Sequence, residues 1–197
     1  MSLYRKGGKR ALDIALALAG LPVVGATAII AGPLLRRDGG PALHRSTRLG
    51  HGQAPFTMLK FRSMIVDAPD LRNADGSTFN AADDPRVTPV GRVLRRTSLD
   101  ELPQILNVLR GDMSFVGPRP SPTGNQSRYD EVALRRFEVK PGITGLDQAL
   151  NRNSGTLEER FANDARYVED CSLSLDLWIL GRTFLGVGRQ EGLYRNA

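Results

Sequence analysis

The sequence predicts a mainly α-helical protein with little β-structure, in which a membrane-associated helix over residues 1–37 precedes a small globular domain over residues 38–197. Three observations support this fold class. One long apolar run lies near the N-terminus, several later segments repeat apolar residues at helical spacing, and a single short segment alternates as a strand does. The length allows one globular domain, and 41% hydrophobic residues are enough to build its core.

The apolar run covers residues 11–35 and contains one charged residue, Asp13. A helix of about 25 residues is long enough to span a bilayer core. Pro22, near the middle, removes a backbone donor and predicts a kink. Both flanks are basic, and positive charge favours the cytoplasmic side. A kinked, re-entrant helix that enters and leaves by the same face satisfies both flanks. The flanking cations are Arg5, Lys6, Lys9, Arg10, Arg36 and Arg37.

Two other interpretations apply to an apolar run near an N-terminus. A secretory signal peptide is disfavoured, because the run is too long for a signal and no small-residue cleavage site follows it. A buried core helix of a soluble protein stays open as an alternative.

The remaining elements are expected in the following order. A turn-rich linker over residues 36–41 leads to a strand over residues 55–64, which runs into a polar loop over residues 67–86. Apolar spacing then predicts helices over residues 90–96, 102–113 with a stop at Gly111, 127–140, 156–170 and 173–189. Thr156 and Glu159 form a predicted capping box. The last helix, with Trp178, either packs in the core or lies flat in the headgroup region as an interfacial amphipathic helix.

The charge of the chain limits its partners. A net charge of +6 and a pI near 10.0 point to phosphate groups on nucleic acid, lipid or a phosphorylated substrate. Aromatic residues make up only 6% and are not interleaved with the basic residues, which argues against nucleic-acid binding. The single cysteine, Cys171, excludes an intrachain disulfide and fits a reducing compartment.

The segment "SLDELPQ", residues 98–104, places Asp100 and Glu101 side by side. Ser98 and Glu101 match a capping box, and Asp100 in a first helical turn would be kept ionised by unpaired backbone N–H groups. The alternative is chemistry, because a carboxylate among arginines suits nucleophilic phosphoryl transfer. The arginines concerned are Arg92, Arg95, Arg96, Arg110 and, in the turn "GPRP", Arg119.

Several motifs together resemble one family. They are "KRALD" before the apolar run, "PFTMLKFRSM", the long block "DPRVTPVGRVLRRTSLDELPQILNVLRGDMSFVGPRP", and "KPGITG". In these motifs, from about Tyr4 to Val187, the chain is similar to the small monotopic phosphoglycosyl transferases of the bacterial sugar transferase family, which begin lipid-linked glycan assembly. The central block is the most specific part of the resemblance.

The resemblance implies a reaction and its residues. A sugar 1-phosphate would pass from a UDP-sugar to undecaprenyl phosphate with release of UMP, for exopolysaccharide, capsule, O-antigen or glycoprotein glycan synthesis. Asp100 matches the family nucleophile, which forms a covalent phosphosugar intermediate in a ping-pong reaction. Glu101 matches the second acid of the dyad, and both acids are implied ligands of Mg²⁺.

The resemblance also implies binding residues, and the chain departs from the family pattern at three places. The resemblance assigns phosphate binding to Arg95, Arg119, Lys60 and Arg62. It assigns nucleotide-sugar binding to Thr144, Gln148 and Arg152. The family often has Ser before the kink proline, where this chain has Leu21. Asp147 and Asn151 replace the residues common after "GITG", which puts the nucleotide or sugar specificity in question.

The implied location is the bacterial inner membrane, with the catalytic domain on the cytoplasmic face. Membrane lipid is an implied partner, and a homo-oligomer or an association with downstream glycosyltransferases is left open. A different class of function, a non-catalytic scaffold that binds anionic lipid, would keep the arginines and amphipathic helices. Such a scaffold would not need the acid pair beside the "GPRP" turn.

Overall fold

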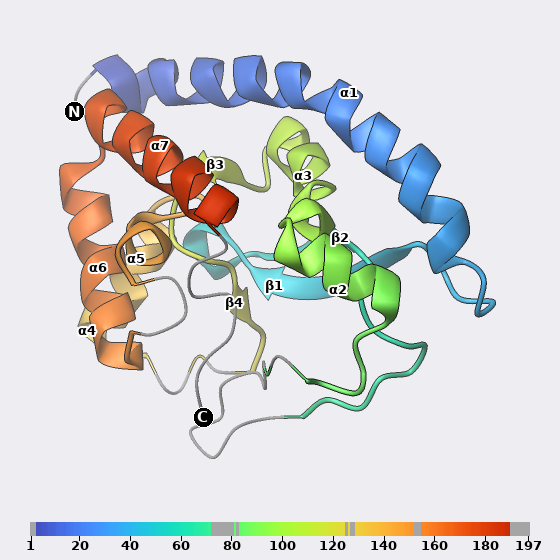
Figure 1. Cartoon of the computed structure of the whole chain (residues 1–197). Coiled ribbons are helices and arrows are strands. Elements are labelled where there is room, and N and C mark those ends of the chain that lie inside the picture. The colour runs from blue at the N-terminus through green and yellow to red at the C-terminus, as the bar shows by residue number, and fades with distance from the viewer. Residues whose placement is uncertain are drawn as a thin grey trace.

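A computed structural model of the chain describes residues 3–71, 81, 83–124, 126, 129–151 and 155–189. It confirms a mainly α-helical fold with little sheet (Figure 1). Helix α1 (Lys9–Leu35) follows a short π-helical turn, η1 (Tyr4–Gly8), and arches along one side of the molecule. Its N-terminal end lies beside the C-terminal helices, and its second half runs in a different direction from its first (Figure 1).

Helix α1 is continuous through Pro22 and also contains Pro33. The helical segment Tyr4–Leu35 is long and apolar enough to cross a membrane by length and composition, and 22% of its most apolar window is buried in the protein. Ile29 and Ile30 are 77% and 70% exposed. The re-entrant topology stays a prediction that these features suit.

One face of α1 packs on the globular domain through helix α3 (Gln104–Arg110). Ala17 is fully buried against Ile105 and Val108. The two helices approach closely at Gly20, where a Cβ atom would lie 2.7 Å from Ile105 Cδ1. The buried carboxylate of Asp13 accepts hydrogen bonds of 2.9 Å from Ser114 Oγ and of 2.9 Å from the Phe115 N–H. The one acid in the apolar run is therefore a structural anchor.

Two of the basic residues before the apolar run make contacts inside the protein. Arg10 donates to the Val108 and Leu109 carbonyls at 2.6 and 2.9 Å, at the C-terminal end of α3. Lys9 forms an ion pair of 2.6 Å with the buried Asp176. Cations at a helix C-terminus stabilise its unpaired carbonyls. These cations therefore attach α1 to the rest of the protein. Their positive charge is for this reason weaker evidence that the flank lies on the cytoplasmic side of a membrane.

Two small sheets form the centre of the domain. Strand β2 (Pro55–Phe61) confirms the first part of the predicted strand and pairs with β1 (Leu43–Leu49), which the sequence did not predict. Strand β4 (Ser121–Pro122) completes an antiparallel sheet of order β2-β1-β4. The second sheet is a parallel pair of β3 (Ser114–Val116) and β5 (Gly142–Thr144).

The helices of the second half pack against the parallel pair. The predicted helix over 127–140 is wrong in its extent, because Asp130 caps a short α4 (Glu131–Leu134) that continues as the 3₁₀ segment η5 (Arg135–Glu138). Helix α6 (Leu157–Asp170) has the predicted capping box. Helices α5 and α7 cover Leu146–Leu150 and Leu173–Arg189.

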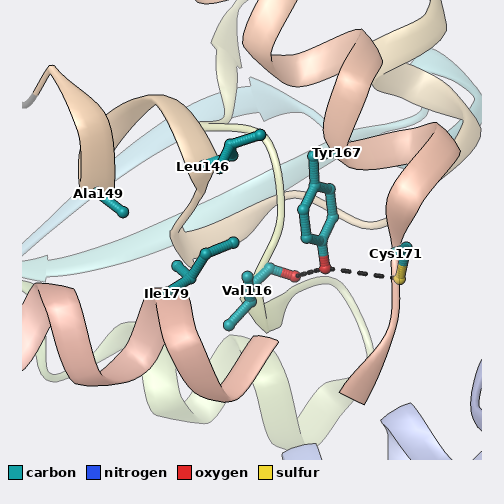
Figure 2. Close-up of a cluster of buried hydrophobic side chains, with 6 residues drawn as sticks. All are labelled: Val116, Leu146, Ala149, Tyr167, Cys171 and Ile179. Atoms are coloured by element: carbon teal, nitrogen blue, oxygen red, sulfur yellow. Dashed lines mark hydrogen bonds between the residues drawn. The ribbon is translucent and has the colours of Figure 1, made fainter. Parts of the chain in front are cut away.

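The core between α5, α6, α7 and β3 is shown in Figure 2. Its buried members are Val116, Leu146, Ala149, Tyr167, Cys171 and Ile179. Tyr167 is fully buried, and its hydroxyl donates to the Val116 carbonyl at 3.1 Å. The other side of α7 is exposed, with Phe184 at 82%. Helix α7 therefore contributes to the core, while its interfacial placement stays a prediction.

Candidate active site

Asp100 and Glu101 lie in a single 3₁₀ turn, η3 (Leu99–Glu101), between α2 (Pro89–Arg96) and α3. The predicted capping box at Ser98 is wrong. Ser98 has a left-handed backbone, with φ of 57°, and makes no side-chain cap. Ser98 separates α2 from η3, and η3 contacts strand β2. Pro103, rather than Ser98, is the residue that precedes α3.

Glu101 is held by two cations from different elements. Lys60 Nζ, on β2, lies 2.5 Å from Glu101 Oε1, and Arg119 Nη2 lies 3.1 Å from the same oxygen. Burial alone would raise the pKa of Glu101, but Lys60 and Arg119 outweigh it and lower the pKa to about 2. Glu101 is therefore ionised at every physiological pH.

Asp100 has the opposite environment. It is 9% exposed, and no hydrogen bond to its side chain is found among the residues that the structure describes. Burial raises the pKa of Asp100 to about 6, with a further increase from Glu101, against the lowering effects of Lys60, Arg95 and Arg119. This pKa still leaves Asp100 mostly ionised at neutral pH, as expected from the sequence, although no backbone N–H group is hydrogen-bonded to its side chain in the described part of the chain. Above about pH 6, Asp100 is a desolvated carboxylate next to cations, which suits a nucleophile.

The turn that carries Arg119 is held by closely packed glycines. The Gly117 N–H donates to the Thr144 carbonyl at 2.9 Å. A Cβ atom on Gly142 would lie 2.2 Å from Gly117 N, and one on Gly145 would lie 2.3 Å from Gly117 O. Because neither position has room for a methyl group, the "GPRP" and "KPGITG" segments touch backbone to backbone. This contact fixes where Arg119 leaves the turn toward Glu101.

The other predicted phosphate ligands differ in position. Arg95 lies near Asp100, lowers the pKa of that carboxyl group, and donates through Nε to Ser63 Oγ at 2.9 Å. Arg62 is buried instead at the end of α1, where it pairs with Asp38 at 2.6 Å and donates to the carbonyls of Leu35, Pro41 and Met64. Since protein groups occupy its whole guanidinium, Arg62 is placed as a structural residue rather than in the predicted phosphate contact.

The residues assigned to the nucleotide-sugar lie behind the "GPRP" turn. Thr144 is buried, with its hydroxyl 2.7 Å from that of Thr183 on α7. Gln148 Nε2 donates to the Ile143 carbonyl at 3.2 Å. Within the described part of the chain, neither side chain is hydrogen-bonded to Asp100 or Glu101. Arg152 lies outside the described residues.

Two of the three departures from the family pattern, Asp147 and Asn151, are hydrogen-bonded to one another. Asn151 Nδ2 donates to Asp147 Oδ1 at 3.1 Å, and Asn163 on α6 donates to the same oxygen at 3.1 Å. Arg160 Nε lies 3.4 Å from Asp147 Oδ2. Asp147 is 4% exposed, so it ties α5 to α6 within the domain.

One residue that contacts the Arg119 backbone was not predicted from the sequence. Arg136, on η5, donates through Nη2 to the Arg119 carbonyl at 2.8 Å and lies 3.0 Å from Asp164 on α6. In the sequence, Arg136 is one of two adjacent arginines in an amphipathic segment. The only local signal is therefore a charge that falls on the buried side of that segment.

The chain is similar to one family of known proteins. A family model described as bacterial sugar transferase matches residues 4–190. The chain is 42% identical over 87% of its length to "Galactosyl transferase CpsE" of Streptococcus agalactiae, of which the match covers 40%. It is 40% identical over 84% of its length to "Undecaprenyl-phosphate galactose phosphotransferase" of Salmonella typhimurium, of which 39% is covered. A third relative is "UDP-glucose:undecaprenyl-phosphate glucose-1-phosphate transferase" of Caulobacter vibrioides, 42% identical over 89% of this chain and 67% of that protein.

The chain thus spans about two fifths of the length of the first two relatives. The match includes the whole described part of the site, from Lys60 through Asp100 and Glu101 to Arg119 and Gln148.

Proposed function

Because the chain belongs to the bacterial sugar transferase family, we propose that it transfers a sugar 1-phosphate from a UDP-sugar to undecaprenyl phosphate and releases UMP. One observation carries the proposal: a desolvated Asp100 lies next to a Glu101 that two cations, Lys60 and Arg119, hold in place. A lipid scaffold needs cations alone and gives no reason to bury a carboxylate among them.

The first proposed step is nucleophilic. An oxygen of Asp100 attacks the β-phosphorus of the UDP-sugar, a P–O bond forms, and the P–O bond to the bridging oxygen breaks so that UMP leaves with that oxygen and its electron pair. The product is an acyl phosphate in which Asp100 carries the sugar phosphate. Burial leaves Asp100 little hydration to lose on reaction, and Arg95 and Arg119 are the cations near the developing charge.

The second step regenerates the enzyme. A phosphate oxygen of undecaprenyl phosphate attacks the same phosphorus, and the bond between phosphorus and Asp100 breaks to release the carboxylate. Glu101 orients Lys60 and Arg119 for the incoming phosphate in this proposal. The apolar surface of α1 would hold the catalytic site next to the lipid acceptor, on the cytoplasmic face of the bacterial inner membrane.

The site also suits a magnesium ion. Mg²⁺ is usually bound by one or two carboxylates together with substrate phosphates. Asp100 has no hydrogen-bond partner among the described residues, and the contacts of Glu101 described above use Oε1. Asp100 and Glu101 would therefore hold the ion, with the diphosphate as the remaining ligand. When bound, Mg²⁺ neutralises charge on the phosphates.

The proposal is tested by trapping the intermediate. Purified protein is incubated with a UDP-sugar and Mg²⁺ but without undecaprenyl phosphate, and its intact mass is measured. The expected result is a mass increase equal to one phosphosugar, which disappears when the lipid phosphate is added. The mass measurement is repeated with several UDP-sugars, because the site does not specify the sugar.

Asp100→Asn provides the decisive variant, because it keeps the shape of the side chain and removes the nucleophilic charge. It should give no adduct and no UMP. An adduct of unchanged yield on Asp100→Asn would reject Asp100 as the nucleophile. Arg166→Gln, on an exposed part of α6, is the matched control and should behave as the wild type.

A further inference from the structure

Arg119 is held both by its side chain and by its backbone. Its guanidinium contacts Glu101 at 3.1 Å, while its backbone carbonyl accepts a hydrogen bond of 2.8 Å from Arg136 Nη2. The glycine contact around Gly117 fixes the chain before Arg119, and Arg136 fixes it at Arg119 itself. Arg136 is 6% exposed, so water competes little for this bond.

Arg136 is in turn held by groups that face it from α6. Asp164, which is 2% exposed, lies with Oδ2 at 3.0 Å from Arg136 Nη2. This contact is an ion pair by distance, but its angle is not that of a hydrogen bond, and Oδ2 has no hydrogen-bond partner among the described residues. The Phe161 ring lies under the guanidinium, with its centroid 5.2 Å from Cζ. Charge and an aromatic face therefore both orient Arg136.

The charged groups near Asp164 come from three elements. Arg136 on η5 and Arg160 on α6 stabilise its carboxylate, and Asp147 on α5 opposes it. Burial, the largest effect, raises the pKa of Asp164 to about 6. A buried charge of this kind is costly unless its partner remains in place.

We propose that the Arg136–Asp164 pair positions Arg119, so that residues of the second half of the chain, outside the acid dyad, set the geometry at Glu101. This inference rests on the proposed function, because Arg119 is assigned there to the developing charge of the first step and to the incoming phosphate of the second. Arg136 and Asp164 are positioning residues: they act through the carbonyl and turn of Arg119. Arg136 contacts Arg119 at its backbone, so the pair can affect the reaction only through the guanidinium that this backbone places. The effect of the pair on activity therefore requires the Arg119 side chain.

The experiment is a double-mutant cycle between Asp164→Asn and Arg119→Ala. For the full chain with UDP-sugar and undecaprenyl phosphate, kcat/KM for UMP release and the thermal midpoint are measured for the wild type, both single variants and the double variant. A displacement of about 1 Å at a reacting site costs on the order of 100-fold in rate, so Asp164→Asn should lower kcat/KM by at least about tenfold.

In the Arg119→Ala background the same Asp164→Asn change should lower kcat/KM by less than about twofold, while its effect on the thermal midpoint should be the same in both backgrounds. General loss of structure would give equal factors in both backgrounds, and that result would overturn the inference. So would wild-type kcat/KM in Asp164→Asn.

A second variant covers the case in which Asp164→Asn does not fold. Arg136→Lys keeps the positive charge opposite Asp164 but loses the planar guanidinium that lies on Phe161 and reaches the Arg119 carbonyl. It should remain folded and lose about tenfold in kcat/KM, again only when Arg119 is present. Wild-type activity in Arg136→Lys would contradict the inference.

Two controls separate this inference from the proposed function. Arg135→Gln changes the neighbouring exposed arginine, which pairs with Glu138 and Glu169, and should leave kcat/KM unchanged. If the wild type releases no UMP from any UDP-sugar tested, the proposed function fails. If the wild type is active and Asp100→Asn is not, but Asp164→Asn shows full activity, only the positioning role fails.

Discussion

A single methyl group at Gly145 should test how the active-site turn is held. The backbone of Gly145 is extended, with φ of −161°, so that an alanine is not strained by its own conformation. Its Cβ atom would lie 2.3 Å from the Gly117 carbonyl oxygen and 3.1 Å from Gln148 Oε1. The side chain of Gln148 can move, but the Gly117 oxygen belongs to the backbone of the "GPRP" turn.

Relief of this contact requires the turn to move by about 1 Å, which is the shift from the close approach to an ordinary van der Waals distance. Overpacking of this kind costs about 1–3 kcal/mol of folding free energy. A displacement of about 1 Å at the reacting groups costs on the order of 100-fold in rate. Gly145→Ala should therefore lose about 100-fold in kcat/KM, while a folding cost of about 1–3 kcal/mol leaves a domain of ordinary stability folded, so that unfolding does not account for the lost activity.

The assay compares kcat/KM for UMP release with the thermal midpoint of the same preparation. Gly181→Ala is the matched control, because a Cβ atom on Gly181 has no atom within 4 Å and the residue is in the interior of α7. The control should keep wild-type activity. If Gly145→Ala were as active as Gly181→Ala, the contact between the two backbone segments would not set the position of Arg119.

Three further predictions follow from the charges and the caps. Since Asp100 must be ionised to attack, kcat/KM should fall about tenfold per pH unit below the Asp100 pKa of about 6. Glu101→Gln removes a negative neighbour and should move this acidic limb of the pH–rate profile to lower pH. A shift of the acidic limb to higher pH would contradict this. Asp13→Ala leaves the Ser114 hydroxyl and Phe115 N–H unpaired and should cost about 3 kcal/mol in chemical denaturation, whereas a cost near zero would show that α1 docks without this anchor. Thr156→Ala removes a capping box and should cost about 1 kcal/mol of stability without changing kcat, as checked by denaturation and kinetics on one sample.

The helices that were predicted correctly have strong local signals. Helix α6 begins at a Thr156–Glu159 capping box, and α3 ends at Gly111 in the left-handed conformation that favours glycine. Strand β1 has no such signal, because "LHRSTRL" is mostly polar and half exposed and is defined by its pairing with β2. The helix over 127–140 was overextended because apolar spacing does not reveal that Asp130 caps a later start.

The site was predictable where one short motif carries it. Asp100 and Glu101 are adjacent in the sequence, and Arg119 follows a rigid turn. Lys60 and Arg62 share a motif, but β2 ends at Phe61, so the period of two that would keep them on one face is lost between them. Arg136 and Asp164 meet only in the folded chain, 28 positions apart by their numbers. Such long-range pairs give no local sequence pattern from which they could be predicted.

The anchors of α1 have a consequence for how the protein is made. Ribosomes synthesise η1 and α1 before the elements that follow them in the chain, yet the hydroxyl of Tyr4 and the ammonium of Lys9 reach Asp176, which lies 172 and 167 positions later. The carboxylate of Asp13 likewise waits for Ser114, 101 positions downstream. Contacts across such long separations close slowly, because the intervening chain loses entropy before they form. Helix α1 is therefore synthesised before the residues that anchor it and is among the last elements of this domain to reach its final place, and until then lipid or a chaperone must cover its apolar surface.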